Sequence, residues 1–318
     1  DDNYSIIFRR LSIIDISDNA NQPFINKEEN IELVFNGEIY NYKELKKELK
    51  KKGHKFITSS DTEVVLKSYE EWNIDFVKKL RGMFSIVLFD KRNNKTFFIR
   101  DHFGQKPLYY SFFNKGLIVS SEIKDILFIL KKNKIKSPEN IQTVEKYLLR
   151  GWSDDSNETF YKNIYQFPKS TISTYFNNKL LKPISYWMLK TKGKKEYNKA
   201  TFVNKFKENI KLHLRSDVPI AFTLSGGIDS ASIVKIASKF INVNAFSLRS
   251  EYDDESNIIN KLLIKKNINH NYINILNTEK KNTLRNLIKM QDEPLISASH
   301  YDQHLLRKII KKKGFKVI

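Results

Sequence analysis

The stretch that most constrains the fold runs from Val218 to Lys239, VPIAFTLSGGIDSASIVKIASK, where an apolar run meets two glycines and then an amphipathic segment. This order predicts a strand, a tight turn and the N-terminus of a helix. The first N–H groups of a helix have no partner within the helix, and two glycines let a bulky anion approach them. The pattern therefore predicts a phosphate-binding loop. No Gly-Lys-Ser/Thr follows the glycines, so the loop is not a Walker A motif.

Five residues of this loop are suited to binding a pyrophosphate group. Gly226 and Gly227 have no side chain that would keep an anion from the backbone N–H groups, and Ser225 and Ser230 add hydroxyl donors. Asp229 offers a carboxylate to a Mg²⁺ ion that bridges phosphate oxygens. The structural alternative is an ordinary Gly-Gly turn between a strand and a helix. The two serines and the aspartate in register with the turn favour the phosphate loop.

The segment SGGIDS resembles the pyrophosphate loop of the ATP pyrophosphatases, and the longer SDVPIAFTLSGGIDS is similar to the glutamine-hydrolysing asparagine synthetase family. The resemblance implies ATP and Mg²⁺ as cofactors. It also implies cleavage of ATP between the α and β phosphates, which releases PPi and leaves an adenylated substrate.

The residues after this loop predict a doubly wound parallel α/β sheet. We expect a second strand over 242–248, a helix over 257–267 and a third strand over 271–276, after an amphipathic helix over 201–215. Ligands of such sheets lie at the carboxyl ends of the strands. Leu224 and Leu248 lie at two such ends, and we expect them to contact adenine; ordinary core leucines are the alternative.

The first 190 residues have a different, α+β pattern with an antiparallel sheet. Short apolar segments predict strands over 5–8, 11–14, 31–35, 38–40, 83–90, 95–100, 108–113 and 117–120, with returning strands between 164 and 187. Helical patterns cover 42–51, 62–72, 122–130 and 142–149. Asn36-Gly37 lies between two apolar segments and predicts a type I′ hairpin turn.

Six ordered segments here resemble the class II glutamine amidotransferase domain, an N-terminal-nucleophile fold of sheets sandwiched between helices. They are residues 10–15, 36–41, 60–63, 81–84, 100–110 and 121–124. The resemblance implies that Arg10 pairs with the α-carboxylate of glutamine, a bidentate role that suits guanidinium. Glu38 and Asp61 would hold the α-ammonium group. Asn36 and the N–H of Gly37 would form the oxyanion hole.

Two of these residues also have purely structural interpretations. Asn36 alone predicts a turn, and either Ser60 or Asp61 can cap the helix over 62–72, with Glu63 near the capping-box position.

The family's nucleophile is an N-terminal cysteine, and the 318 residues contain none. We expect a missing upstream segment; a relative that has lost glutaminase activity, similar to β-lactam synthetase, is the alternative. The presence of Arg10, Asn36, Glu38 and Asp61 favours the first. We therefore expect an amidotransferase domain over 1–190 that lacks its nucleophile segment, a polar linker over 191–200, and an ATP pyrophosphatase domain over 201–318 that lacks its C-terminal part.

The function implied by the resemblance is that of a glutamine-hydrolysing asparagine synthase, with glutamine, aspartate and ATP as substrates and a homodimer as one assembly it allows. An alternative acceptor is a sugar or peptide carboxylate, because Gln291 to Pro294, Ser297 and Ser299 resemble the acyl-acceptor segment without identifying the acceptor. His300 and His304 have the spacing of a metal pair on a helix, but no third ligand accompanies them.

The net charge of +20 permits a basic nucleic-acid-binding module as a remote alternative. The lysines are scattered and mixed with glutamate, which favours a solvated surface, so no nucleic-acid partner is expected. No apolar run reaches the roughly 20 residues that cross a bilayer, and no signal peptide opens the chain, so we expect a cytoplasmic protein without a membrane partner.

Overall fold

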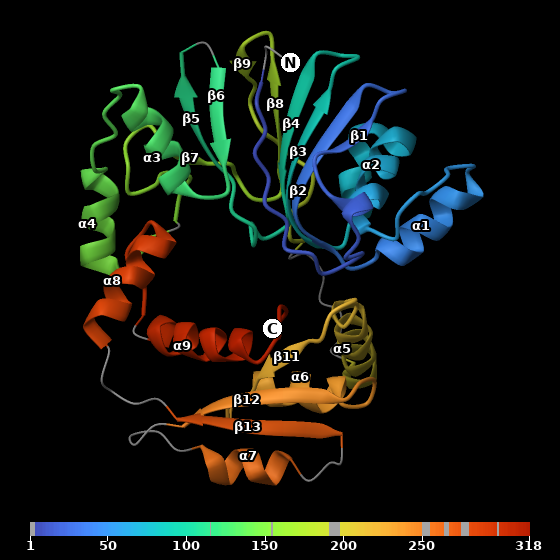
Figure 1. Ribbon diagram of the computed structural model, residues 1–318, viewed down its shortest axis with the longest axis vertical. Coiled ribbons are helices and arrows are strands. Elements are labelled where there is room, and N and C mark those ends of the chain that lie inside the picture. Colours follow the sequence, from blue (N-terminus) through green and yellow to red (C-terminus); the bar gives the residue numbers. More distant parts are fainter. Residues whose placement is uncertain are drawn as a thin grey trace. The chain divides into compact units, whose positions relative to one another are not determined.

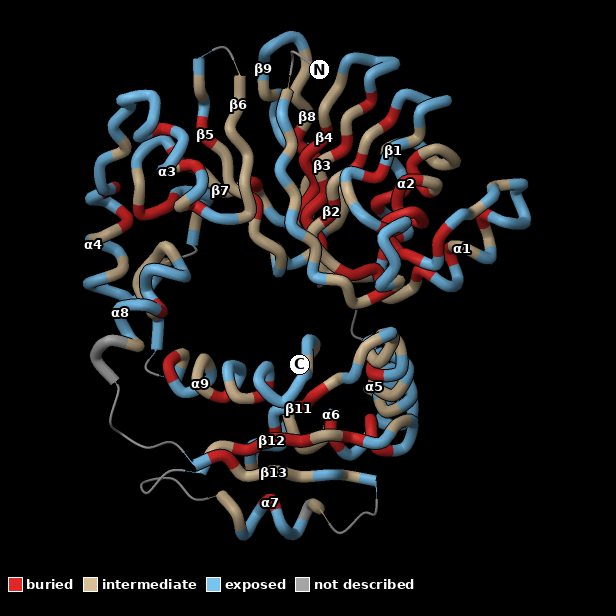
Figure 2. The backbone as a smooth tube through the Cα atoms, viewed as in Figure 1, coloured by how far each residue is buried: buried red, intermediate tan, exposed pale blue. Residues whose placement is uncertain are grey.

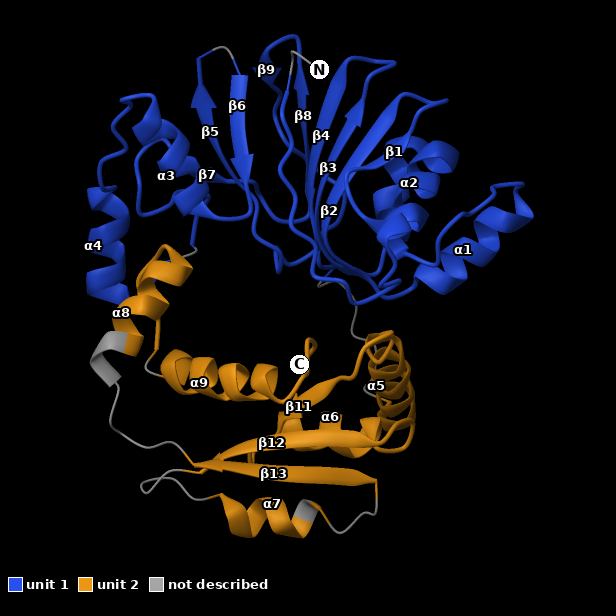
Figure 3. Cartoon of the chain, in the orientation of Figure 1, with its two compact units in different colours: residues 1–192 blue, residues 193–318 orange. Residues whose placement is uncertain are grey.

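The computed structural model describes residues 4–114, 116–153, 155–190, 198–249, 255–263, 267–274, 280–297 and 299–318. The chain forms two compact units, residues 1–192 and 193–318, which Figure 3 colours separately. Residues 191–197 of the predicted linker lie outside the described residues.

Two antiparallel sheets form the centre of unit 1. Within the described residues, the larger sheet has seven strands in the order β1-β2-β3-β4-β8-β10, with β9 paired to β8, and the smaller has the order β6-β5-β7. The strands of the larger sheet are β1 Phe24–Asn26, β2 Ile31–Ile39, β3 Gly82–Asp90, β4 Lys95–Arg100, β8 Thr171–Phe176, β9 Lys179–Leu180 and β10 Ile184–Ser185. Those of the smaller sheet are β5 Tyr109–Phe113, β6 Gly116–Ser120 and β7 Tyr165–Gln166.

Helices cover the outer faces of both sheets. The helices are α1 Tyr42–Lys51, α2 Asp61–Trp72, the 3-10 segments η1 Asp18–Ala20 and η2 Asn73–Lys79, α3 Ile123–Lys132 and α4 Ile141–Arg150. One apolar core joins α1 and α2 to the larger sheet, a second lies between the sheets around Phe98 and Phe167, and a third joins α3 to the smaller sheet around Ile126. Figures 1 and 2 show this helix–sheet–sheet–helix layering, with many buried residues in β2, β3, β4 and α2. The predicted α+β sandwich is confirmed.

Two local predictions for unit 1 are wrong. Residues 5–8 and 11–14 form no strand, and Asn36-Gly37 is not a hairpin turn, because β2 continues through both residues. Gly37 lies opposite Phe84 of β3, and a Cβ at Gly37 would come within 2.2 Å of the Met83 carbonyl oxygen. The glycine therefore serves the close approach of two strands rather than a turn.

Unit 2 has a three-stranded parallel sheet in the order β11-β12-β13, formed by Ala221–Thr223, Val243–Arg249 and Ile268–Asn274. Its helices are α5 Lys199–His213, α6 Ile228–Ala237, α7 Ser256–Leu262, α8 Lys280–Gln291 and α9 Ser299–Lys312. One core cluster contains residues of α5, α6 and α7, and a separate cluster packs α9 with all three strands. Helices on both faces confirm the doubly wound arrangement. Val317 forms a parallel bridge with Ile220 beside β11.

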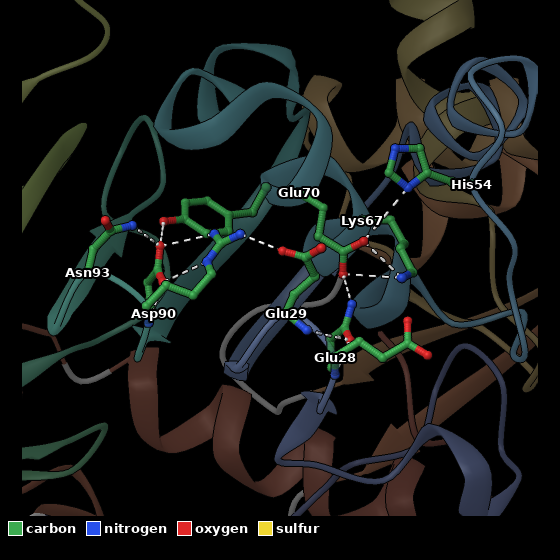
Figure 4. A network of polar contacts seen from close by, with 10 residues as sticks. Glu28, Glu29, His54, Lys67, Glu70, Asp90 and Asn93 are labelled. Carbon is green, nitrogen blue, oxygen red and sulfur yellow. Dashed lines mark hydrogen bonds and ion pairs between the residues drawn. The ribbon is translucent and has the colours of Figure 1, made fainter.

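A polar network links the turns of unit 1 to α2 (Figure 4). Asp90, at the end of β3, is 1% exposed and accepts hydrogen bonds from Tyr69 Oη at 2.7 Å, Asn93 Nδ2 at 2.8 Å and Arg92 Nε at 3.0 Å. Arg92 also pairs with Glu29 at 2.6 Å. Burial by itself would raise the pKa of Asp90, but these donors lower it to about 2.

We expect Asp90→Asn to destabilise the protein by about 2 kcal/mol at pH 7, because the hydrogen bonds of the folded state stabilise the ionised carboxylate. A lowered pKa makes this contribution present above about pH 4 and lost as the pH falls toward 2. Urea unfolding at pH 7 and at pH 3 measures the difference. Asp75→Asn is the matched control, because Asp75 is 69% exposed and its pair with Lys78 should contribute under about 1 kcal/mol. Equal destabilisation by both substitutions would contradict the prediction.

Candidate functional site

A cleft of about 1520 Å³ opens in unit 1 between the two sheets. The residues predicted to bind glutamine all line it: Arg10, Asn36, Gly37, Glu38 and Asp61. The fold thus brings together side chains from the N-terminal loop, from β2 and from the first turn of α2.

The backbone of β2 is exposed at one edge along the second half of the strand, because β1 pairs only with Ile31 to Leu33. At that edge the Gln22 side chain acts as a neighbouring strand: its Oε1 accepts the N–H of Phe35 at 2.6 Å and its Nε2 donates to the Phe35 carbonyl at 3.0 Å. Two residues on from Gly37, the N–H of Ile39 donates to Asp61 Oδ2 at 3.0 Å. Because backbone groups alternate between the two edges of a strand, Gly37 directs its N–H to this same edge.

Asn36 and Glu38 lie on the opposite face of β2 from its core residues. Ile31, Leu33 and Phe35 are buried in the core beneath α2, and the alternation of side chains places Asn36 and Glu38 toward the cleft. An amide side chain and a backbone N–H therefore adjoin the carboxylates, which is the arrangement an oxyanion hole beside an ammonium site requires.

The two carboxylates of the cleft are buried and resist ionisation. Burial and the neighbouring Asp61 charge raise the pKa of Glu38 to about 7, with Lys106 acting in the opposite direction. Burial also raises the pKa of Asp61 to about 6, although the N–H of Ile39 stabilises its charged form. Two neighbouring buried carboxylates favour a cation bound beside them.

Asp61 is the first residue of α2 rather than its cap. Ser60 is the N-cap and accepts the N–H of Thr62 at 3.1 Å, while Asp61 turns back to Ile39. Glu63 forms no capping box; it accepts the N–H groups of Ile57 and Thr58, at 2.9 and 2.8 Å. Ser60 therefore fills the cap position, and the Asp61 carboxylate ties the first turn of α2 to β2.

Arg10 organises the loop that carries it. Its guanidinium donates to the carbonyl oxygens of Ile14 at 2.9 Å, Asp15, and Ser17 at 3.0 Å. Asp15 in turn accepts the N–H of Ser59 at 2.7 Å, which ties this loop to the residues before α2. The guanidinium thus binds the Ile14 carbonyl at the end of the 11–14 segment, which forms no strand. Pairing of Arg10 with a carboxylate ligand stays a prediction.

Gln22 and Lys106 are cleft residues to which the sequence pattern assigned no role. Lys106 lies within the segment 100–110, which carries the amidotransferase resemblance. The sequence does not show that Lys106 lies near Glu38. Gln22 has no sequence signal, because its partner Phe35 is 13 residues away.

In unit 2, the predicted phosphate loop joins β11 to α6, whose N-cap is Gly227. Ser225 and Ser230 close the loop, with their Oγ atoms 2.8 Å apart and the Ser225 N–H donating to Ser230 Oγ at 3.1 Å. The N–H of Gly226 donates to Glu255 Oε2 at 2.7 Å. The loop is thus a strand, turn and helix N-terminus, as predicted.

The strand ends beside the loop are held by side-chain hydrogen bonds. Ser247 Oγ on β12 donates to the Leu224 carbonyl at 2.5 Å and lies 2.7 Å from Nε2 of His270 on β13. A carbonyl only accepts, so the hydroxyl proton points to Leu224 and His270 is the donor to Ser247. The Leu224 side chain is 3% exposed within the core, and Leu248 packs against the α9 cluster. Adenine contact by either leucine stays a prediction.

Asp229 lies in the first turn of α6 and is exposed, so its carboxylate can reach a ligand at the loop. Carboxylate and phosphate oxygens are the ligands that Mg²⁺ prefers, and one protein carboxylate with phosphate oxygens and water is a common set. Asp229 therefore fits a Mg²⁺ bound together with a polyphosphate.

The remaining sequence candidates lie near the start of α9. Ser297 and Ser299 have Oγ atoms 3.0 Å apart, and His300 and His304 follow on α9. Among the described residues, no group of three or more acidic, histidine or cysteine side chains is arranged to hold a metal. In the described part of the chain, no helix has the length and apolar character needed to span a membrane.

The chain matches two family models along its length. Residues 1–187 match the glutamine amidotransferase domain and residues 201–318 match asparagine synthase. Glutamine-hydrolysing asparagine synthetases 1 and 2 of Bacillus subtilis are each 35% identical to it, over 76% and 79% of this chain and 38% and 35% of their own length. The amidase chry2 of Gibberella zeae is 34% identical over 73% of this chain and 34% of its own. The chain thus spans less than two fifths of the length of these relatives.

Proposed function

This chain belongs to the asparagine synthetase family, and we propose that it carries the glutamine and ATP sites of a glutamine-hydrolysing asparagine synthase. The observation that carries the glutamine half is the cleft itself: two buried carboxylates that favour a cation lie beside the Asn36 amide and the Gly37 N–H. An α-amino acid amide has the matching groups, an ammonium and a carbonyl oxygen that becomes negative during hydrolysis.

In the proposed reaction, hydrolysis of glutamine yields glutamate and ammonia in unit 1. Asn36 and Gly37 stabilise the oxyanion of that step, while Glu38 and Asp61 hold the ammonium group. The 318 residues include no cysteine, so the nucleophile expected from the family is not among them.

In unit 2, the β-carboxylate of aspartate displaces PPi from ATP and forms an acyl-adenylate, from which ammonia displaces AMP. The loop from Ser225 to Ser230 binds the phosphates that leave, and Asp229 would hold a Mg²⁺ ion, which when bound would neutralise part of their charge. Similarity to an asparagine synthase family that uses ATP supports this half.

A second candidate acceptor is the carboxylate of a different small molecule, such as a sugar or a peptide. The 34% identity to a protein named as an amidase favours keeping this candidate, since relatives at the same distance carry different names. The proposed glutamine and ATP chemistry is the same for both candidates.

Release of PPi from Mg-ATP tests the function in the full-length protein that contains this chain. We expect aspartate to stimulate PPi release. We expect Asp229→Ala to reduce PPi release by about a hundredfold or more, because the Mg²⁺ that accompanies the leaving phosphates would lose its protein ligand. Asp217→Ala is a control, because it removes the same charge in the segment before β11.

Stimulation by other carboxylates and not by aspartate would replace the acceptor while keeping the ATP chemistry. Unchanged turnover in the Asp229→Ala protein would exclude the phosphate-loop assignment.

A further inference from the structure

A carboxylate of the protein lies where the phosphate loop would hold an anion. Glu255 Oε2 accepts the N–H of Gly226 at 2.7 Å. A Cβ built at Gly226 would lie 3.2 Å from both Cδ and Oε1 of Glu255, so the carboxylate lies directly over the glycine. The absent side chain at Gly226 thus makes room for an anion, and in this structure the anion is Glu255.

The position of Glu255 is built into the fold rather than left to a free side chain. Glu255 is the N-cap residue of α7, and α7 is anchored by Ile259, which is 1% exposed in the core of unit 2. Tyr272 on β13 donates through its hydroxyl to Asn260 Oδ1 at 3.0 Å and to the Ser256 carbonyl at 3.4 Å. These contacts place the start of α7 beside the loop from β11 to α6.

Although Glu255 occupies the N-cap position of α7, its side chain does not cap the helix. The side chain of an N-cap residue normally accepts an N–H from the first turn of its own helix, and Glu255 makes no such bond to α7. Its carboxylate instead reaches across 29 residues of sequence to Gly226. Helix stability therefore does not explain the contact.

We propose that Glu255 is an internal competitor for the phosphate position of the loop, an inference that rests on the proposed function of that loop. A carboxylate and a phosphate oxygen have the same sign of charge and accept the same N–H, so both cannot occupy Gly226 at once. A polyphosphate must displace Glu255 before it binds there. Glu255 thereby sets the affinity of the loop and keeps it closed to weakly bound anions.

Pyrophosphate affinity tests this role directly, by calorimetry with inorganic pyrophosphate at fixed ionic strength and with EDTA present. We expect Glu255→Ala to bind pyrophosphate about ten- to a hundredfold more tightly than the wild type, because a charge-assisted hydrogen bond no longer has to be broken. Glu255→Gln keeps the size and the acceptor but not the charge, so we expect an intermediate gain.

Glu208→Ala is the matched control, because it removes the same charge from an exposed position of α5. We expect it to change the affinity less than about twofold, since exposed charges at a distance are screened by salt. Thermal unfolding of each variant establishes whether it is folded. If Glu255→Ala does not fold, Glu255→Gln still tests the role of the charge.

Two results would overturn the inference, and they differ in what they imply for the loop. If the wild type binds pyrophosphate and the Glu255 variants bind it equally or more weakly, Glu255 is not a competitor and the loop assignment stands. If neither the wild type nor any variant binds pyrophosphate, the proposed function of the loop fails and the inference fails with it.

Discussion

Glu38→Gln should abolish most glutamine binding and, at the same time, make the protein more stable at pH 8. Both effects have one cause, the buried carboxylate in the cleft. Glu38 is 6% exposed, and its burial together with the neighbouring Asp61 charge raises its pKa to about 7. Ionisation of Glu38 therefore destabilises the folded protein, and a bound ammonium group would offset that destabilisation.

The sign of the stability effect follows from the raised pKa. Stability associated with Glu38 is complete below the pKa of an unfolded glutamate, about 4.5, and is lost as the pH rises through about 7. The neutral glutamine avoids this loss, so Glu38→Gln should gain up to about 3 kcal/mol at pH 8 and almost nothing at pH 4. Glutamine binding should weaken about ten- to a hundredfold, because a charged hydrogen bond is removed.

Glu32→Gln is a control on the same strand and the same face of β2. Burial would raise the pKa of Glu32, but hydrogen bonds from Lys91 and Tyr4 lower it overall, so this substitution should cost stability at pH 8. Calorimetric titration with glutamine and thermal unfolding at pH 4 and pH 8 measure both variants. Wild-type affinity for glutamine in Glu38→Gln, or a loss of stability at pH 8, would contradict the role assigned to Glu38.

The elements that the sequence predicts best are those whose stability is local. Helix α1 begins at Tyr42 and ends at Lys51, as the spacing of Leu45 and Leu49 indicates, because an amphipathic helix is visible in its own residues. The first two parallel strands and the loop of unit 2 were predicted for the same reason, since the apolar run and the glycines are contiguous. The third strand begins at Ile268, before its predicted start at 271, and residues 275 and 276 of that prediction lie outside the described residues.

Predictions failed where a distant partner decides the structure. Asn36-Gly37 is a local turn signal, yet pairing with Phe84 and Ser85 of β3 keeps the chain extended. Three of residues 11–14 are apolar, yet the segment forms no strand and its Ile14 carbonyl accepts a hydrogen bond from Arg10. Such contacts depend on tertiary structure, which overrides local preference.

Which residues come together in the cleft was predictable only through the family resemblance. From the residues alone, Asp61 had equal claims as a cap and as a ligand, and only the structure shows Ser60 in the capping role. The contact between Glu255 and Gly226 left no trace in the sequence, because a charged loop and a glycine turn are each ordinary by themselves.

Gly37→Ala should break the pairing of β2 with β3 and displace the backbone N–H that Gly37 contributes to the cleft. The new Cβ would lie 2.2 Å from the Met83 carbonyl oxygen and 2.7 Å from Cα of Phe84, which are backbone atoms of β3 that cannot move aside as a flexible side chain can. The two strands must separate, and we expect a loss of about 3 kcal/mol or more of stability. Urea unfolding measures it.

Gly116→Ala separates this effect from the general consequences of replacing a strand glycine. Gly116 lies in β6, and its nearest neighbour to an added Cβ is the Phe113 carbonyl oxygen at 3.8 Å, an ordinary contact, so we expect a change under about 1 kcal/mol. Asn36→Ala keeps the close approach of β2 and β3 and removes the adjoining amide, so it should leave stability nearly unchanged while weakening glutamine hydrolysis in the full-length protein about a hundredfold. If Gly37→Ala were as stable as Gly116→Ala, the tight approach of β2 to β3 would not hold; if Asn36→Ala hydrolysed glutamine normally, the oxyanion site would lie elsewhere in the cleft.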